Sequence, residues 1–116
     1  NCDPSEPIPV LQISGVDDKI VPIDGSMSAA GGWSGAPHID EVVDQWSNLN
    51  SCTTIDSVFL SGKTNAYYHR GCINNHEVWY YKIDDWGHEW PDSYDNTGTN
   101  ASEVIWLFFS NFLGTN

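Results

Sequence analysis

Runs of apolar residues mark four strands that the sequence predicts. Residues 8–15, Ile-Pro-Val-Leu-Gln-Ile-Ser-Gly, are short, mostly apolar and ended by glycine. Such near-continuous hydrophobicity is typical of a strand covered on both faces, as in a parallel sheet between helices. Residues 77–83 are rich in the aromatic and branched side chains that strands favour. Weaker strand patterns at residues 55–60 and 65–70 are separated by a Ser-Gly-Lys turn.

The pattern between residues 37 and 50 predicts an amphipathic helix. Pro37 suits the first helical position, and Asp40 and Glu41 are favourable in the first turn. The apolar residues recur at helical spacing and share one face: Ile39, Val42, Val43, Trp46 and Leu49.

A second helix is predicted for residues 101–113. Asn100 is a natural N-cap with Glu103 three residues later, and Gly114 can end the helix. Its apolar residues surround most of the circumference: Val104, Ile105, Trp106, Leu107, Phe108, Phe109, Phe112 and Leu113. Such a helix needs burial on more than one side. We expect it to pack against polypeptide beyond this sequence or against a second copy of the chain.

The order of these elements predicts the fold class. A strand, a long loop, a helix, two weak strands, a strand, a histidine-bearing loop and a helix follow one another along the chain. This alternation favours an α/β architecture, with a mainly parallel sheet flanked by helices. At 116 residues, the chain is expected to form a single domain over residues 1–116.

Composition and charge exclude several partners. A hydrophobic content of 40% with six tryptophans argues against disorder. The formal charge of -12 disfavours nucleic acid and anionic membrane surfaces, because binding to phosphates needs positive charge. No apolar run approaches the roughly twenty residues that span a bilayer. The first residues lack both an initiator methionine and a signal peptide, so we expect a mature, processed or truncated product.

The three cysteines, Cys2, Cys52 and Cys72, are widely spaced. No two of them form a Cys-x-x-Cys pair, which makes a zinc site improbable. A bridge between Cys52 and Cys72 would close a loop of about twenty residues and contribute on the order of 3 kcal/mol. Such a bridge would suit a secreted or periplasmic protein. Cys2 would then have its partner in another part of a longer chain, or would be a free thiol.

Two loops carry candidate catalytic side chains. Asp17 and Asp18 follow the first predicted strand, and His88 follows the last one, in the turn Asp-Asp-Trp-Gly-His-Glu-Trp-Pro. Loops at strand ends are where rigid scaffolds present proton-transfer groups. An imidazole activates a serine hydroxyl when a carboxylate fixes its tautomer and stabilises its cation. The alternative is a surface histidine in a tryptophan-rich turn.

Five motifs in register resemble one family. They are Gly-x-x-Asp-x-x-Val-Pro after the first strand, Trp and Asn-x-Cys at the first helix end, a later cysteine, Gly-His-Glu-Trp-Pro, and Trp-Leu-Phe-Phe in the last helix. Together they resemble the C-terminal half of the polyhydroxybutyrate depolymerase and feruloyl esterase group. The resemblance covers nearly the whole chain and implies a partial α/β-hydrolase fold whose N-terminal half is absent.

The resemblance assigns roles to individual residues. It implies that Asp18 is the acid of a Ser, acid, His triad, with Asp17 as its competitor, and that His88 is the general base. It also implies a disulfide between Cys52 and Cys72. Trp86 and Trp90, whose rings could stack on a substrate, are the expected substrate-binding residues. The chain departs from the family in having Asp85 and Trp86 where glycines are usual and Asp92 after the proline, which bears on substrate preference.

The sequence contains no Gly-x-Ser-x-Gly nucleophile motif. The nearest approach, Gly-Trp-Ser-Gly at residues 32–35, has misplaced glycines and no strand before it. We therefore expect half of a serine ester hydrolase, inactive alone, that acts with its N-terminal half on an ester-containing polymer or polysaccharide and needs no cofactor. The family leaves polyhydroxyalkanoates and feruloylated or acetylated polysaccharides open as substrates.

A second interpretation is a binding module without catalysis. Trp33, Trp86 and Trp90 could stack on sugar rings or on a polymer surface, although such aromatic residues more often serve packing. A calcium site at residues 92–98 is disfavoured, because their oxygen-bearing side chains fit no calcium-loop spacing and lack a terminal glutamate. No metal site is predicted.

Overall fold

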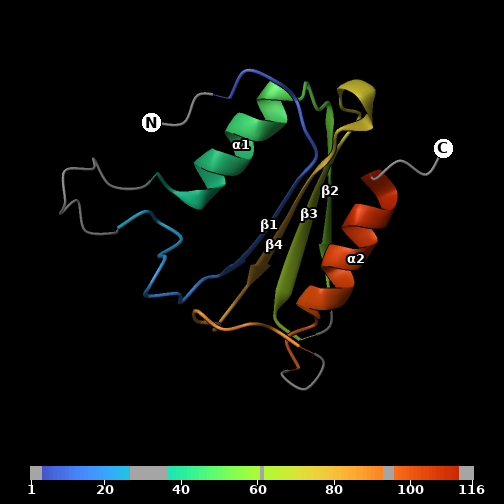
Figure 1. Cartoon of the computed structure of the whole chain (residues 1–116). Coiled ribbons are helices and arrows are strands. Elements are labelled where there is room, and N and C mark those ends of the chain that lie inside the picture. Colours follow the sequence, from blue (N-terminus) through green and yellow to red (C-terminus); the bar gives the residue numbers. More distant parts are fainter. Residues whose placement is uncertain (1–3, 27–36, 61, 93–95, 113–116) are drawn as a thin grey trace.

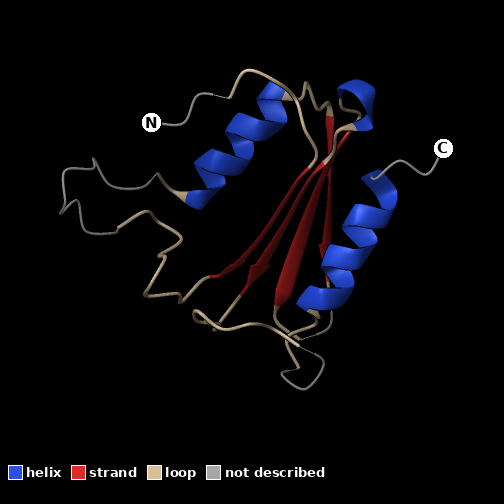
Figure 2. Cartoon of the chain, viewed as in Figure 1, coloured by secondary structure: helices blue, strands red, loops and turns tan. Residues whose placement is uncertain are grey.

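The computed structural model describes residues 4–26, 37–60, 62–92 and 96–112. Within them a four-stranded sheet lies between two helices, and the loops gather at the two ends of the sheet (Figures 1 and 2). In spatial order, the strands are β1 (Val10–Gly15), β4 (Val78–Ile83), β3 (Thr64–Arg70) and β2 (Thr54–Phe59). The helices are α1 (Ile39–Leu49), α2 (Ala101–Phe112) and the short 3₁₀ turn η2 (Ile73–Asn75).

The predicted fold class is wrong, because the sheet is mixed rather than mainly parallel. β1 and β4 pair in parallel, whereas β4 with β3 and β3 with β2 pair antiparallel. The connections explain the difference. Residues 60–63 join β2 to β3, and residues 71–77 join β3 to β4. Parallel neighbours need a crossover of a dozen or more residues, so these short links permit only antiparallel pairing. The sheet is therefore not that of an α/β-hydrolase.

Each face of the sheet is covered by one helix. On the α1 face, Val43 packs with Val78 and Tyr80 of β4. On the α2 face, Phe108 packs with Ala66, Trp79 and Tyr81. Successive β4 side chains point to opposite faces, which is why one run of apolar residues supplies both clusters.

Both long helices begin at a side-chain cap. The Nδ1 atom of His38 accepts a hydrogen bond from Asp40 N–H at 3.1 Å, so α1 begins at Ile39, two residues later than the predicted start at Pro37. The Oδ1 atom of Asn100 accepts a hydrogen bond from Glu103 N–H at 3.1 Å, which makes Asn100 the N-cap of α2. The outward side of α2 keeps a strip of apolar side chains in solvent, namely Trp106, Leu107 and Phe109.

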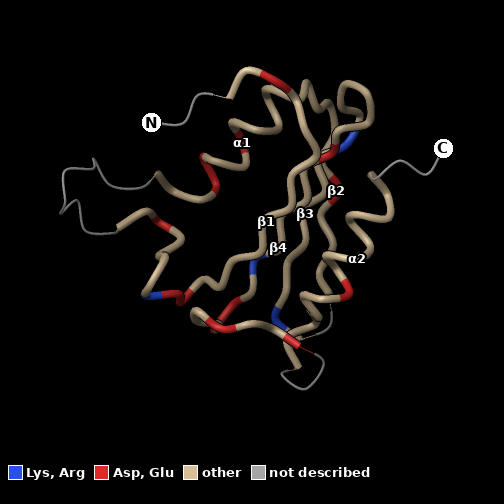
Figure 3. Tube along the Cα trace, in the orientation of Figure 1, with Lys and Arg blue, Asp and Glu red and all other residues tan. Residues whose placement is uncertain are grey.

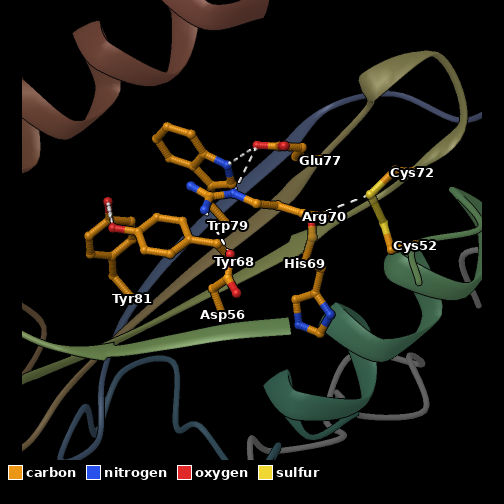
Figure 4. Close-up of polar contacts among 9 residues, drawn as sticks. All are labelled: Cys52, Asp56, Tyr68, His69, Arg70, Cys72, Glu77, Trp79 and Tyr81. Atoms are coloured by element: carbon orange, nitrogen blue, oxygen red, sulfur yellow. Dashed lines mark hydrogen bonds and ion pairs between the residues drawn. A yellow bond between two sulfur atoms is a disulfide. The ribbon is translucent and has the colours of Figure 1, made fainter. Parts of the chain in front are cut away.

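A disulfide and a buried amide tie the end of α1 to its surroundings. Cys52 and Cys72 are bonded across 20 positions of sequence, so the end of α1 is joined to the link between β3 and β4 (Figure 4). Asn50 is fully buried, and its Nδ2 group donates to the Ile8 and His76 carbonyls at 2.6 and 2.8 Å. These contacts hold the chain that enters β1 and the chain that enters β4 at the same end of the sheet.

Acidic positions recur along the loops and α1, with few basic positions between them (Figure 3). None of the helices in the described ranges is long and apolar enough to cross a membrane.

Candidate functional site

The parallel pair of strands brings the two predicted loops together. β1 and β4 align from Val10 beside Val78 to Gly15 beside Ile83, so their carboxyl ends lie at the same edge of the sheet. Backbone bonds continue beyond the strands. Val16 N–H donates to the Ile83 carbonyl and Asp17 N–H to the Trp86 carbonyl, both at 2.9 Å. Backbone hydrogen bonds therefore tie the loop that carries Asp18 to the loop that carries His88.

Gly15 permits this close approach. A β-carbon at position 15 would lie 2.7 Å from the Gly87 carbonyl oxygen and closer still to that of Trp86. Both obstacles are backbone atoms, which cannot rotate away as a flexible side chain would. The absence of a side chain at Gly15 thus lets the histidine loop lie directly against the end of β1.

Three donors hold the carboxylate of Asp18. Its Oδ1 atom accepts hydrogen bonds from the backbone N–H groups of Ile20 and Val21, both at 2.8 Å, in an Asx-turn arrangement. Its Oδ2 atom lies 2.8 Å from Nδ1 of His88. Burial raises the pKa of Asp18, but the Val21 amide, the His88 ring and the Ile20 amide together outweigh it and lower that pKa below 3.8. Asp18 is therefore a carboxylate at neutral pH.

The contact between His88 and Asp18 fixes the tautomer of the imidazole. An ionised carboxylate only accepts hydrogen bonds, so the Nδ1 atom of His88 must carry the proton and donate it to Asp18. Nε2 of the neutral ring then keeps its lone pair. The Asp18 side chain is 12% exposed, whereas that of His88 is 54% exposed. The carboxylate of Asp18 is therefore held inside the turn, whereas the His88 ring is about half exposed.

A cavity of about 390 Å³ adjoins this pair. Asp18 and His88 line it, together with the end of β1, Pro91 and the first residue of α2. Trp86 and Trp90 both line it, but differently. Trp86 is half-buried and its indole N–H donates to the Glu89 carbonyl at 3.0 Å, which closes the histidine turn. Trp90 is 60% exposed and has a broad aromatic surface available for contact.

The structure distinguishes Asp18 from Asp17. Asp18 meets His88, whereas Asp17 is exposed and contributes its backbone N–H to the loop contact. The donors of Ile20 and Val21 were not foreseen from the sequence. An acid after a glycine-ended strand is a recognised Asx-turn signal and could have indicated them.

Several sequence predictions lie outside the described residues. They are the Gly-Trp-Ser-Gly segment at residues 32–35 with Trp33, the partner of Cys2, the middle of the 92–98 segment, and the helix end at Gly114. Within the described ranges, no group of three or more histidine, cysteine, aspartate or glutamate side chains is arranged to hold a metal ion.

Comparison with protein-family models and with curated proteins finds no match to this sequence. The chemistry assigned to the chain therefore rests on the geometry around His88 and on the motifs themselves.

Proposed function

We propose that Asp18 and His88 are the acid and the base of a serine ester hydrolase whose nucleophile is supplied by another polypeptide segment. The observation that carries the proposal is the 2.8 Å contact between Asp18 Oδ2 and His88 Nδ1, beside a cavity that both residues line. The resemblance to the polyhydroxybutyrate depolymerase and feruloyl esterase group supports the same assignment, independently of the fold.

The chemistry follows from the tautomer of His88. Nε2 removes the proton from a serine hydroxyl as the serine oxygen bonds to the ester carbonyl carbon, and Asp18 stabilises the imidazolium that forms. The imidazolium then gives the proton to the departing alcohol as the ester bond breaks. Water repeats the sequence on the acyl-enzyme, and it releases the acid and restores the serine.

Neither the sequence motifs nor the described lining of the cavity supplies a nucleophile in the setting that this chemistry requires. Its sequence lacks Gly-x-Ser-x-Gly, and among the described residues that line the cavity only Ser14 has a hydroxyl. Ser14 lies within β1 rather than on a strand-to-helix turn, and its Oγ atom accepts a hydrogen bond from Gln12 at 2.9 Å. A nucleophile elbow requires a different setting. We therefore assign the serine and its oxyanion hole to the companion segment.

The test compares residues 1–116 alone with the same residues extended by the polypeptide encoded immediately upstream. Methyl ferulate and a polyhydroxybutyrate oligomer serve as unactivated esters. We expect no turnover from residues 1–116 and turnover from the extended protein. In the extended protein, Asp18→Asn should lower kcat by about 10³-fold or more, because the asparagine favours the wrong tautomer of His88. Asp17→Asn, its exposed neighbour, is the matched control and should retain activity.

Two outcomes would overturn the proposal. One is His88-dependent or Ser14-dependent turnover by residues 1–116 alone, which would place the nucleophile within this chain. The other is equal activity of Asp18→Asn and Asp17→Asn in the extended protein, which would remove Asp18 from the catalytic pair.

The exposed apolar strip of Trp106, Leu107 and Phe109 indicates that another surface packs against α2. We assign that surface to the same companion segment or to a self-association partner. The substrate class is an ester-containing polymer or polysaccharide. The disulfide supports a secreted or periplasmic location, since such bonds persist in oxidising compartments.

The exposure of Trp90 favours a second candidate, a polysaccharide- or polymer-binding module without catalysis. Residues 1–116 would then bind insoluble xylan or polyester directly, and Trp90→Ala would abolish the binding. Retention of Trp90→Ala on the polymer at wild-type levels would contradict this role.

A further inference from the structure

The outer edge of β2 is open in the part of the chain that the structure describes. β2 is the last strand of the sheet and pairs only with β3, and every one of its residues is exposed. An edge strand presents a row of backbone donors and acceptors to any other strand that can pair with it.

The hydrogen-bond pattern shows which residues offer these groups. Leu60 N–H donates to the Thr64 carbonyl at 2.9 Å, so this pair at the hairpin is a hydrogen-bonded one. Such pairs alternate along an antiparallel ladder. Because the Leu60–Thr64 pair is hydrogen-bonded and such pairs recur at every second residue, the even-numbered residues of β2 direct their backbone groups to β3. Ile55, Ser57 and Phe59 therefore direct their N–H and C=O groups outward.

The side chains of these three residues share one face of the sheet. Ile55 and Ser57 are paired with His69 and Tyr67 on the α1 face. Ile55 is 59% exposed and Phe59 is 66% exposed, so two large apolar groups lie beside the open edge with the small Ser57 between them.

Among the described residues, β2 lacks the lysine and proline that commonly protect an edge strand from pairing. Natural edge strands are commonly blocked by lysine, proline or an unpaired charge. β2 has no lysine or proline, and its single charge, Asp56, lies 2.8 Å from the Arg70 side chain of the same chain (Figure 4). The charge is therefore compensated before any partner arrives.

We infer that β2 pairs antiparallel with β2 of a second copy of this chain, about a two-fold axis at Ser57. This register places Ile55 opposite Phe59 of the other copy, and Phe59 opposite its Ile55. All three outward-facing residues form hydrogen-bonded pairs, and each exposed apolar side chain gains a cross-strand neighbour. The result is one continuous sheet across two chains.

Neighbouring registers are worse. A shift that centres the axis on Asp56 sets the two Asp56 carboxylates opposite each other. It would also need Thr53 as a donor, but the Thr53 N–H already donates to the Arg70 carbonyl at 2.9 Å. A shift that centres it on Val58 leaves Ile55 beyond the paired region. The register at Ser57 alone uses every outward group of the strand.

The test is sedimentation equilibrium of residues 1–116 at about 0.05 M and about 0.5 M NaCl, since each copy's charge of -12 opposes association until salt screens it. We expect a monomer–dimer equilibrium that tightens with salt. Ser57→Pro removes an outward N–H and leaves the β3 ladder intact, and should weaken dimerisation about tenfold or more. Ser57→Ala keeps the N–H and is the matched control.

A second pair of variants keeps the test decisive if the proline variant unfolds. Phe59→Lys should also weaken the dimer about tenfold, because it replaces an apolar cross-strand contact by a hydrated charge and places a lysine, which commonly blocks pairing, at the edge. Trp106→Lys alters a separate exposed apolar surface, the one on α2, and should leave the dimer intact because this dimer forms through β2. A monomer at both salt concentrations, or a dimer that Trp106→Lys disrupts and Phe59→Lys does not, would overturn the inference.

Discussion

Replacing Gly15 by alanine should separate the acid from the histidine without touching either side chain. The added methyl group would overlap the backbone carbonyls of Trp86 and Gly87, so the histidine loop must move away from the end of β1. This movement stretches the hydrogen bond from Asp17 N–H to the Trp86 carbonyl, now 2.9 Å. It also draws His88 away from Asp18.

The cost can be worked from these contacts. Forcing a methyl group into a filled space costs about 1–3 kcal/mol, and losing the backbone hydrogen bond costs about 1 kcal/mol. Alanine is less flexible than glycine in the unfolded chain, which offsets about 0.4–1 kcal/mol of this loss of stability. We expect the free energy of unfolding to fall by about 1–3.5 kcal/mol, which lowers the urea midpoint by roughly 0.5–2 M.

The matched control is Gly87→Ala, one residue before His88. A β-carbon at position 87 would meet only the Asp17 carbonyl, at 4.0 Å, which is ordinary contact. Urea unfolding followed by tryptophan fluorescence gives the stabilities, and ¹⁵N spectra of the imidazole show whether Nδ1 of His88 carries its proton. The reasoning is refuted if Gly15→Ala is as stable as the wild type with His88 unchanged, or if Gly87→Ala is destabilised equally.

Three further predictions concern stability. The lowered pKa of Asp18 means that its ionised carboxylate stabilises the folded state. This contribution is complete above about pH 5 and is lost as pH falls through 3.8 toward the folded pKa. In unfolding measurements at decreasing pH, the stability difference between the wild type and Asp18→Asn should therefore shrink. Replacing both Cys52 and Cys72 by serine should lower the free energy of unfolding by about 3 kcal/mol, measured in urea, and an unchanged value would contradict the role of the bridge. Asp85 has φ +50°, so Asp85→Gly should raise stability by about 0.5–1 kcal/mol in thermal unfolding while Asp85→Ala lowers it.

The sequence predicted the elements well but not how they join. The helices and strands lie close to their expected ranges, because hydrophobic periodicity and caps such as Asn100 are local signals. The sense of the strands is not local. The link of residues 71–77 between β3 and β4 is too short for a parallel crossover. Connection length therefore indicated antiparallel pairing, whereas the order of the elements alone suggested a parallel sheet.

The apolar run of residues 8–15 also misled. Its near-continuous hydrophobicity indicated a strand enclosed by neighbours, yet most of β1 is only half-buried because β4 is its only partner strand among the described residues. The juxtaposition of Asp18 and His88 was expected from motifs alone. The amide donors of Ile20 and Val21 are local to Asp18 and could have been indicated by its place after a glycine-ended strand. The clearance at Gly15 depends on contacts with a distant loop and was not visible in the residue types.

The position of β1 at the edge of the described sheet gives Asp18 and His88 unequal anchorage. β4, which leads to His88, is bonded on both sides, whereas β1, which leads to Asp18, is bonded on one. Edge strands exchange their amide hydrogens through smaller openings than central strands do. Release of β1 would therefore carry the Asp18 carboxylate away while the His88 ring stays in place, so His88 would lose its hydrogen-bond partner before the chain as a whole unfolds.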